Sequence, residues 1–173
     1  MYRYEQLKSQ CLILGIKASE IERIKILNEL AQKYEVVLYT GSQQTDLLKG
    51  VKIRPKVDYM NVMPKIFHLS KINLNITSRT IESGLSQRIW DVLGVGGFLL
   101  TNYQPELEEY FEIGKDLEVF HDLEELEEKV SYYLKHEEQR IRIAMNGYKK
   151  VRALHKYSNR MEEVLKEVVG YKG

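Results

Sequence analysis

Short apolar and β-branched runs alternate with amphipathic stretches along most of the 173-residue chain. The runs predict strands at 36–40, 51–53, 72–76, 98–101 and 117–120. The stretches predict helices at about 20–34, 60–69, 86–94, 105–112, 122–136, 138–154 and 158–169. Strands separated by helices at this spacing form right-handed βαβ units, which build a parallel sheet. We therefore expect an α/β fold: a Rossmann-like parallel sheet with helices on both faces.

Two helix starts carry a capping-box pattern, in which a short polar residue is followed three positions later by glutamate. Ser19 with Glu22 predicts the start of the first helix, and Asp122 with Glu125 predicts the start of a later one. The glycines at 94–97 follow a helix and precede a strand. They therefore predict a helix end and a tight turn, because a dinucleotide-binding fingerprint needs the opposite order.

Length and composition exclude several classes of protein. The chain fits a single domain over 1–173, and its net charge of +1 with dispersed basic residues argues against a nucleic-acid partner. No apolar run approaches the roughly 20 residues of a transmembrane segment, and the first residues lack the apolar core of a signal peptide. We expect a cytoplasmic protein. The single cysteine, Cys11, has apolar neighbours that favour a buried position.

The most informative stretch runs from Ile76 through a polar loop into the helix that carries Arg88 and Asp91. A helix start offers unpaired N–H groups and a positive dipole end, and Arg88 adds a donor fork suited to phosphate oxygens. Asp91 lies on the same helix face and suits ribose hydroxyls, although an ordinary ion pair with Arg88 is the alternative. The other candidate binding residues here are Ser78, Arg79, Gly84, Ser86 and Gln87.

The next strand end places further polar groups at the same edge of the sheet, since parallel strands share one carboxyl edge. The candidates are Asn102, Tyr103, Gln104 and Glu106. Glu106 either meets sugar hydroxyls or only favours the dipole of the helix that Pro105 opens. The histidines lack metal-ligand spacing and no Asp-x-Asp pair is present, so we expect neither a metal nor a cofactor.

Residues 74–165 resemble the C-terminal domain of GT-B glycosyltransferases, specifically the bacterial spore-protein-like branch of the group-1 enzymes. The segment 84–102 is similar to the family's Arg-x-x-acid helix, glycine turn and following strand. Segments that begin at Pro105, Tyr133, Asn146 and His155 resemble its later landmarks, and residues 22–40 resemble the entry into that domain.

The resemblance implies a nucleotide-diphospho-sugar as donor substrate, with Arg88 stabilising the leaving diphosphate and Asp91 binding the ribose. The loops after Thr40, Ile53 and Ile76 would line the nucleotide pocket, which adds Gly41, Ser42, Arg54 and Tyr59 to the candidates. The chain has Asp91 where group-1 enzymes usually have glutamate. Its first loop lacks Arg and Lys, so phosphate neutralisation would depend on Arg79 and Arg88.

The resemblance also implies metal-independent, retaining transfer of a hexosyl group in a cleft shared with an N-terminal acceptor-binding domain. That domain is not found in these residues, so we expect the isolated chain to bind the donor without transferring sugar. The segment 156–173 is expected to cross toward the missing domain. The alternatives are a non-catalytic nucleotide- or sugar-binding module with this fold, and a flavodoxin-like or receiver-type domain.

Overall fold

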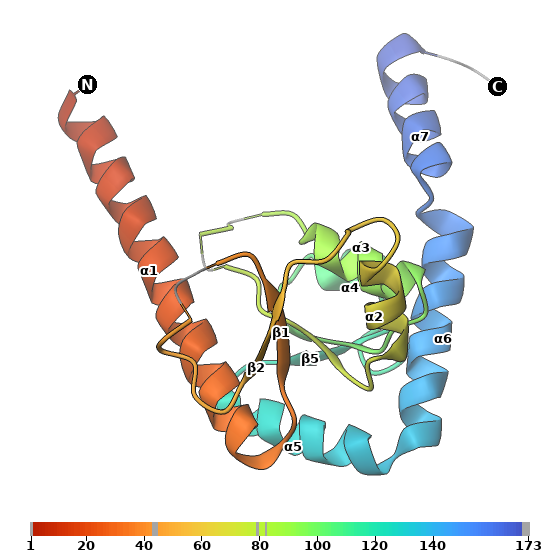
Figure 1. The fold of residues 1–173 in the computed structure, drawn as a ribbon. Coiled ribbons are helices and arrows are strands. Elements are labelled where there is room, and N and C mark those ends of the chain that lie inside the picture. The colour runs from red at the N-terminus through yellow and green to blue at the C-terminus, as the bar shows by residue number, and fades with distance from the viewer. Residues whose placement is uncertain (1, 43–44, 79, 82, 171–173) are drawn as a thin grey trace.

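A computed structural model describes residues 2–42, 45–78, 80–81 and 83–170, and the predicted alternation of strands and helices is confirmed (Figure 1). The helices are α1 Tyr2–Lys33, α2 Met63–Leu69, α3 Gln87–Gly94, α4 Leu107–Tyr110, α5 Leu123–Lys135, α6 Glu137–Leu154 and α7 Tyr157–Val169. The strands are β1 Val37–Thr40, β2 Lys52–Pro55, β3 Asn73–Asn75, β4 Leu99–Asn102 and β5 Glu118–Phe120.

All recorded strand pairs are parallel, as predicted, but they form two sheets rather than one. β1 pairs with β2, and β3, β4 and β5 form the second sheet in that order. β2 is exposed along its whole length, whereas β5 is buried along its whole length. The three-stranded sheet is therefore the part of the fold that lies inside the core.

Successive residues of β4 and β5 pack into two different apolar clusters, because side chains alternate between the faces of a strand. Leu100 and Phe120 join the end of α1, α5 and the start of α6 in one cluster. Leu99 and Val119 join α3, α4 and the end of α6 in the other. Helices thus cover both faces of this sheet, as expected for buried parallel strands.

The carboxyl-terminal end of the helix with Arg88 and Asp91 packs closely against α6. Gly147 lets α6 approach closely, since a Cβ there would lie 2.3 Å from the Asp116 carbonyl oxygen and 2.8 Å from Leu93 of α3. After α3, Gly96 has a φ of 77°, which side chains disfavour. The predicted glycine turn into β4 is confirmed.

The start of the first helix was predicted wrongly, because α1 begins far upstream of Ser19. The Ser19 hydroxyl donates a hydrogen bond of 2.9 Å to the Gly15 carbonyl oxygen four residues earlier in the same helix. Ser19 therefore lies inside α1 and is not its N-cap. Cys11, predicted to be buried, is exposed on this upstream extension. The cap at Asp122 is confirmed, since its carboxylate accepts 2.9 Å from the Glu125 N–H.

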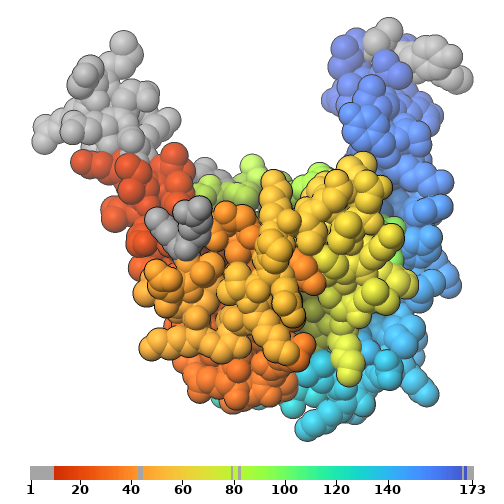
Figure 2. Space-filling view, in the orientation of Figure 1, coloured from red at the N-terminus to blue at the C-terminus, as the bar shows by residue number. Residues whose placement is uncertain are grey.

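The amino-terminal part of α1 and most of α7 extend beyond the body on one side (Figures 1 and 2), while Arg160 near the start of α7 packs on the Trp90 and Tyr110 rings. The loop after β3 and the start of α3 lie on this side, between the two helices (Figure 1). Both helices expose apolar side chains, namely Leu12, Ile13, Leu14 and Ile16 on α1, and Met161, Val164, Leu165 and Val168 on α7. Among the described residues, no helix combines the length and apolar character needed to cross a membrane.

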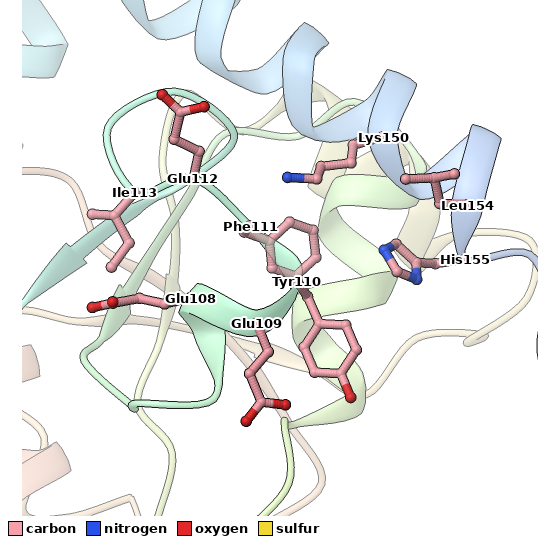
Figure 3. Close-up of a pocket in the computed structure, with 9 residues that line it drawn as sticks. All are labelled: Glu108, Glu109, Tyr110, Phe111, Glu112, Ile113, Lys150, Leu154 and His155. Atoms are coloured by element: carbon pink, nitrogen blue, oxygen red, sulfur yellow. The ribbon is translucent and has the colours of Figure 1, made fainter.

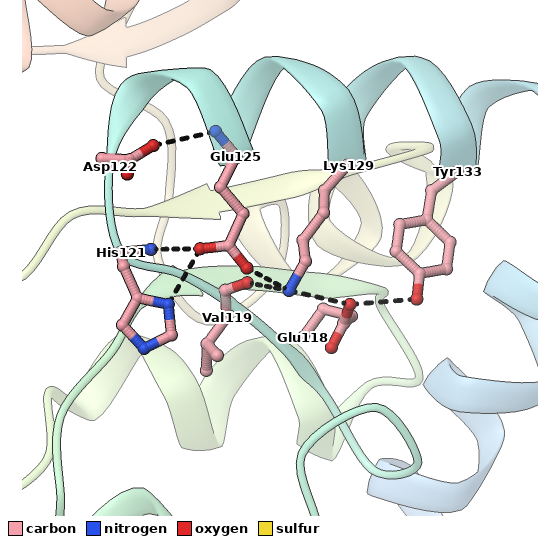
Figure 4. Close-up of polar contacts among 7 residues, drawn as sticks. All are labelled: Glu118, Val119, His121, Asp122, Glu125, Lys129 and Tyr133. Atoms are coloured by element: carbon pink, nitrogen blue, oxygen red, sulfur yellow. Dashed lines mark hydrogen bonds and ion pairs between the residues drawn. The ribbon is translucent and has the colours of Figure 1, made fainter.

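A polar network ties β5 to α5 beneath the carboxyl edge of the sheet (Figure 4). Lys129 binds the carboxylates of Glu118 at 3.3 Å and Glu125 at 2.9 Å, and donates 2.6 Å to the Val119 carbonyl oxygen. Glu118 is only 6% exposed and also accepts from the Tyr133 hydroxyl. Burial alone would raise the pKa of Glu125, but hydrogen bonds from Lys129 and His121 lower it to about 2.

Candidate functional site

The loop that enters α3 ends in a conventional helix cap next to open space. The Ser86 hydroxyl accepts from the Arg88 N–H at 3.3 Å, so this predicted binding residue caps the helix. Gly84 has a φ of 86°, and a Cβ there would have no atom within 4 Å. The backbone before α3 is therefore accessible from outside, as a site for an anion at the helix start requires.

The Arg88 guanidinium lies against two aromatic rings and forms no ion pair with any residue that the structure describes. Its guanidinium carbon lies 5.0 Å from the centre of the Phe67 ring and 5.8 Å from that of Tyr59. Its Nη1 is buried and has no hydrogen-bond acceptor among the residues that the structure describes. A buried donor without an acceptor is costly, so the arrangement favours an anionic ligand that supplies one.

Asp91 is occupied by two neighbours and does not pair with Arg88. Its Oδ2 accepts a hydrogen bond from the Tyr59 hydroxyl, and its Oδ1 accepts from the Gln87 amide at 3.3 Å. The hydrogen bond to Asp91 and partial burial raise the pKa of the Tyr59 phenol. The alternative of an ordinary surface ion pair between Arg88 and Asp91 is thus wrong for the described residues.

Two polar side chains, one at the end of β4 and one just after it, fasten the loop between β3 and α3 at both ends. The Asn102 Oδ1 accepts a hydrogen bond of 2.7 Å from the Thr77 N–H, where the loop begins. The Gln104 Nε2 donates a hydrogen bond of 3.4 Å to the Gly84 carbonyl oxygen, near the end of the loop. Gln104 is 8% exposed, and its Oε1 is buried without a partner in the described part of the chain. These two candidates therefore shape the loop from below.

Sequence reasoning missed the residues that support this loop. Asn75 is buried, and its Nδ2 donates to the hydroxyls of Thr77 at 3.1 Å and Thr101 at 3.0 Å. The available signal was the two asparagines in the short strand predicted at 72–76, since a buried amide needs partners. Phe67, which contacts Arg88, gave no such signal because an apolar residue on a helix is usually part of the core.

The remaining candidates are distributed around this centre. Ser78 binds the Ser19 hydroxyl at 2.9 Å, and Tyr103 donates 2.9 Å to Glu108 while its ring stacks on His121. Arg79 lies outside the described residues.

The structure leaves part of the predicted set apart from α3. Gly41 and Ser42 follow β1, and Arg54 lies on β2. No hydrogen bond, ion pair or ring contact among the described residues joins Gly41 or Arg54 to Arg88 or Asp91.

Two hollows flank α4, and neither is lined by Arg88 or Asp91. One, of about 590 Å³, lies between α4, the loop after it and the end of α6 (Figure 3). The other, of about 260 Å³, is lined by Gly84 and Glu106 together with Trp90 and Arg160. Neither of these two hollows therefore coincides with the place where Arg88 and Asp91 lie.

Comparisons with known proteins concern the family and the fold of the chain. The sequence pattern of a family described as glycosyl transferase-like matches residues 23–166. No curated protein matches the chain at a significant level. Among solved structures, the chain is similar to the C-terminal domain of a glycosyl transferase group 1 family protein, LpcC, from Francisella tularensis. The TM-score is 0.58 at 15% identity, over 79% of this chain and 78% of that one, so this likeness concerns the fold.

Proposed function

Because the chain belongs to the glycosyl transferase-like family and has the fold of a GT-B C-terminal domain, we propose that it binds the donor of a glycosyl transfer, a nucleotide-diphospho-sugar. The diphosphate would lie at the start of α3, where backbone N–H groups and the helix dipole favour negative charge. The family membership also removes the receiver-type alternative, which belongs to a different class of α/β domain.

The observation that carries this proposal is the buried Nη1 of Arg88, which has no hydrogen-bond partner in the described ranges of the chain. Phosphate oxygens match a guanidinium in charge and in spacing, and they would supply the missing acceptor. The Phe67 and Tyr59 rings hold the guanidinium beside the helix start without consuming its hydrogen bonds. Asp91, one turn further along α3, would take the ribose hydroxyls.

In this proposal some of the other candidates contact the donor directly, and others hold the loop that presents it. Gly84 and Gln87 would contact the donor directly, while Asn102 and Gln104 hold the loop that presents it. Glu106, on the rim of the smaller hollow, would meet sugar hydroxyls. The remaining proposed donor contacts are Gly41, Ser42, Arg54, Ser78, Arg79, Ser86 and Tyr103.

We propose a metal-independent and retaining transfer of a hexosyl group for the complete enzyme. When the glycosidic bond to the diphosphate breaks, negative charge grows on the departing oxygen. Arg88 and the N–H groups before α3 would stabilise that charge directly. The absence of an Asp-x-Asp pair from the sequence supports this mode, since such pairs commonly hold a divalent ion against a diphosphate.

An acceptor-binding domain, of the same or another chain, would complete a cleft at the start of α3. The projecting part of α1 and the whole of α7 flank the start of α3, and both expose apolar side chains (Figures 1 and 2). Helices of about 13 residues are marginal alone in water and gain stability from apolar packing. We propose that the second domain packs against these helices, so that the isolated chain binds donor without transferring sugar.

A non-catalytic module is the second candidate, and two departures from group-1 enzymes favour it. Asp91 stands where those enzymes usually have glutamate, and the loop 41–45 has neither Arg nor Lys. A module of this kind would bind the nucleotide and would not transfer sugar even when supplied with an acceptor-binding domain.

Calorimetric titration tests the proposal with uridine, guanosine, adenosine and thymidine diphosphates. We expect micromolar binding of one of them, and at least tenfold weaker binding by Arg88→Gln because a charge-assisted contact to phosphate is lost. Arg152→Gln is the matched control, since Arg152 is an exposed arginine that packs on the Tyr148 ring of α6. Its affinity should equal that of the wild type.

Two results would contradict the proposal. Equal affinities of the Arg88→Gln and wild-type chains would show that the phosphate does not lie on this arginine. Sugar transfer by the isolated chain, measured with a radiolabelled donor, would refute the claim that a second domain is required.

A further inference from the structure

Tyr59 is hydrogen-bonded to the carboxylate of Asp91, the group that the proposed function assigns to binding the ribose. It lies on the turn between β2 and α2, where the N–H groups of Val62 and Met63 donate to the Asp58 carbonyl oxygen at 3.2 and 3.0 Å. Its hydroxyl reaches across to Asp91 on α3. The phenol thus sits where a ligand hydroxyl would make the same hydrogen bond.

We propose that Tyr59 is an internal competitor at this site, whose hydroxyl holds the Asp91 carboxylate in the ligand-free protein and is displaced by the hydroxyl donors of a ligand. The proposal rests on the proposed function, because it takes Asp91 as the ribose-binding group. It adds that nucleotide binding is an exchange, in which the phenol leaves and ribose hydroxyls replace it.

The surroundings of Tyr59 support exchange rather than permanent support of Asp91. Tyr59 is 45% exposed and joins neither of the two apolar clusters, so the phenol can move without disturbing the core. Asp91 keeps a second contact from Gln87 on its own helix. That contact holds the carboxylate near its place when the phenol departs.

The exchange sets a requirement on the ligand. A ligand with no hydroxyl gains nothing from displacing the phenol, because Asp91 would lose a hydrogen bond and be left to water. A ribose offers two neighbouring hydroxyls to the two carboxylate oxygens, so it can replace the lost bond and add one. The Tyr59 hydroxyl therefore lowers the affinity for a ligand whose hydroxyls must displace it from Asp91, and it leaves the affinity for a ligand without hydroxyls unchanged.

The test compares Tyr59→Phe with the wild type by calorimetric titration with the preferred nucleoside diphosphate and with inorganic pyrophosphate. The phenylalanine keeps a ring beside Arg88 and removes only the competing hydroxyl. We expect the nucleoside diphosphate to bind about five- to tenfold more tightly, the size of one hydrogen bond to a charged group partly offset by hydration. Pyrophosphate affinity should stay within about twofold, since it has no hydroxyl for Asp91.

Two further variants make the comparison specific. Tyr132→Phe removes the same atom from an exposed tyrosine of α5, whose hydroxyl donates to Gln139, and should change neither affinity. In an Asp91→Ala background, Tyr59→Phe should have no further effect, because the two residues act through one hydrogen bond.

Every outcome decides the matter. Weaker or unchanged nucleotide binding by Tyr59→Phe would show that the phenol supports Asp91 or is irrelevant to it, and would overturn the inference. An equal gain for pyrophosphate would also overturn it, since the effect would not pass through Asp91. If the wild type binds a nucleoside diphosphate and Arg88→Gln weakens that binding, only this inference fails. If neither the wild type nor Tyr59→Phe binds any diphosphate, the proposed function fails with it.

Discussion

Gly147→Ala should destabilise the protein, although replacing glycine by alanine inside a helix normally stabilises it. Gly147 lies within α6, where alanine is favoured over glycine by about 1 kcal/mol. Here the new Cβ would lie 2.3 Å from the Asp116 carbonyl oxygen and 2.8 Å from Leu93 Cδ2. Leu93 can adjust, but a backbone oxygen next to β5 cannot rotate away, so α6 must shift away from the sheet.

The expected net loss is about 2 kcal/mol of unfolding free energy. Overpacking a close-packed core costs about 1–3 kcal/mol, and a contact this short belongs at the upper end. The gain in helix propensity offsets about 1 kcal/mol of it. For a chain of this size the melting temperature should fall by about 4–8 °C.

Urea denaturation, followed by circular dichroism and by the fluorescence of the single tryptophan, Trp90, measures the effect. Gly94→Ala is the matched control in the same α3–α6 contact, because its Cβ would lie 3.9 Å from Val151, an ordinary contact distance. It should be neutral or slightly stabilising. A Gly147→Ala chain as stable as the wild type would refute the packing argument.

Two further predictions concern the loop before α3 and the network at α5. Asn102→Ala should lower the unfolding free energy by about 1–2 kcal/mol, because it leaves the Thr77 N–H without its acceptor. Asn102→Asp keeps an acceptor and should lose less than half of that in urea denaturation; equal losses would contradict the role of the hydrogen bond.

Glu125 has a folded-state pKa of about 2 against an ordinary 4.5, so its stabilisation is complete above about pH 4.5 and is lost as the pH falls toward 2. Wild type should therefore exceed Glu125→Gln in urea midpoint at pH 7, and the gap should close by pH 2; a gap independent of pH would be inconsistent with this assignment.

Much of the fold follows from the sequence alone because its signals are local. Periodicities of two and 3.6 residues depend only on neighbouring side chains, and they place α3, β4 and α5 within about two residues of their observed bounds. The same local reasoning puts Arg88 and Asp91 on one helix that follows a strand end. It fails for α1, where the capping signal at Ser19 is overridden by the helix that continues upstream.

Only the tertiary structure decides what these two side chains meet. The Phe67 and Tyr59 rings around Arg88, and the Tyr59 hydroxyl on Asp91, come from residues 21 to 32 positions earlier in the chain. No periodic pattern encodes such contacts, because they depend on how α2 and the turn before it pack beside α3. The residue types of the proposed site can thus be predicted from the local sequence. The contacts and the exposure of their side chains depend on packing between distant segments.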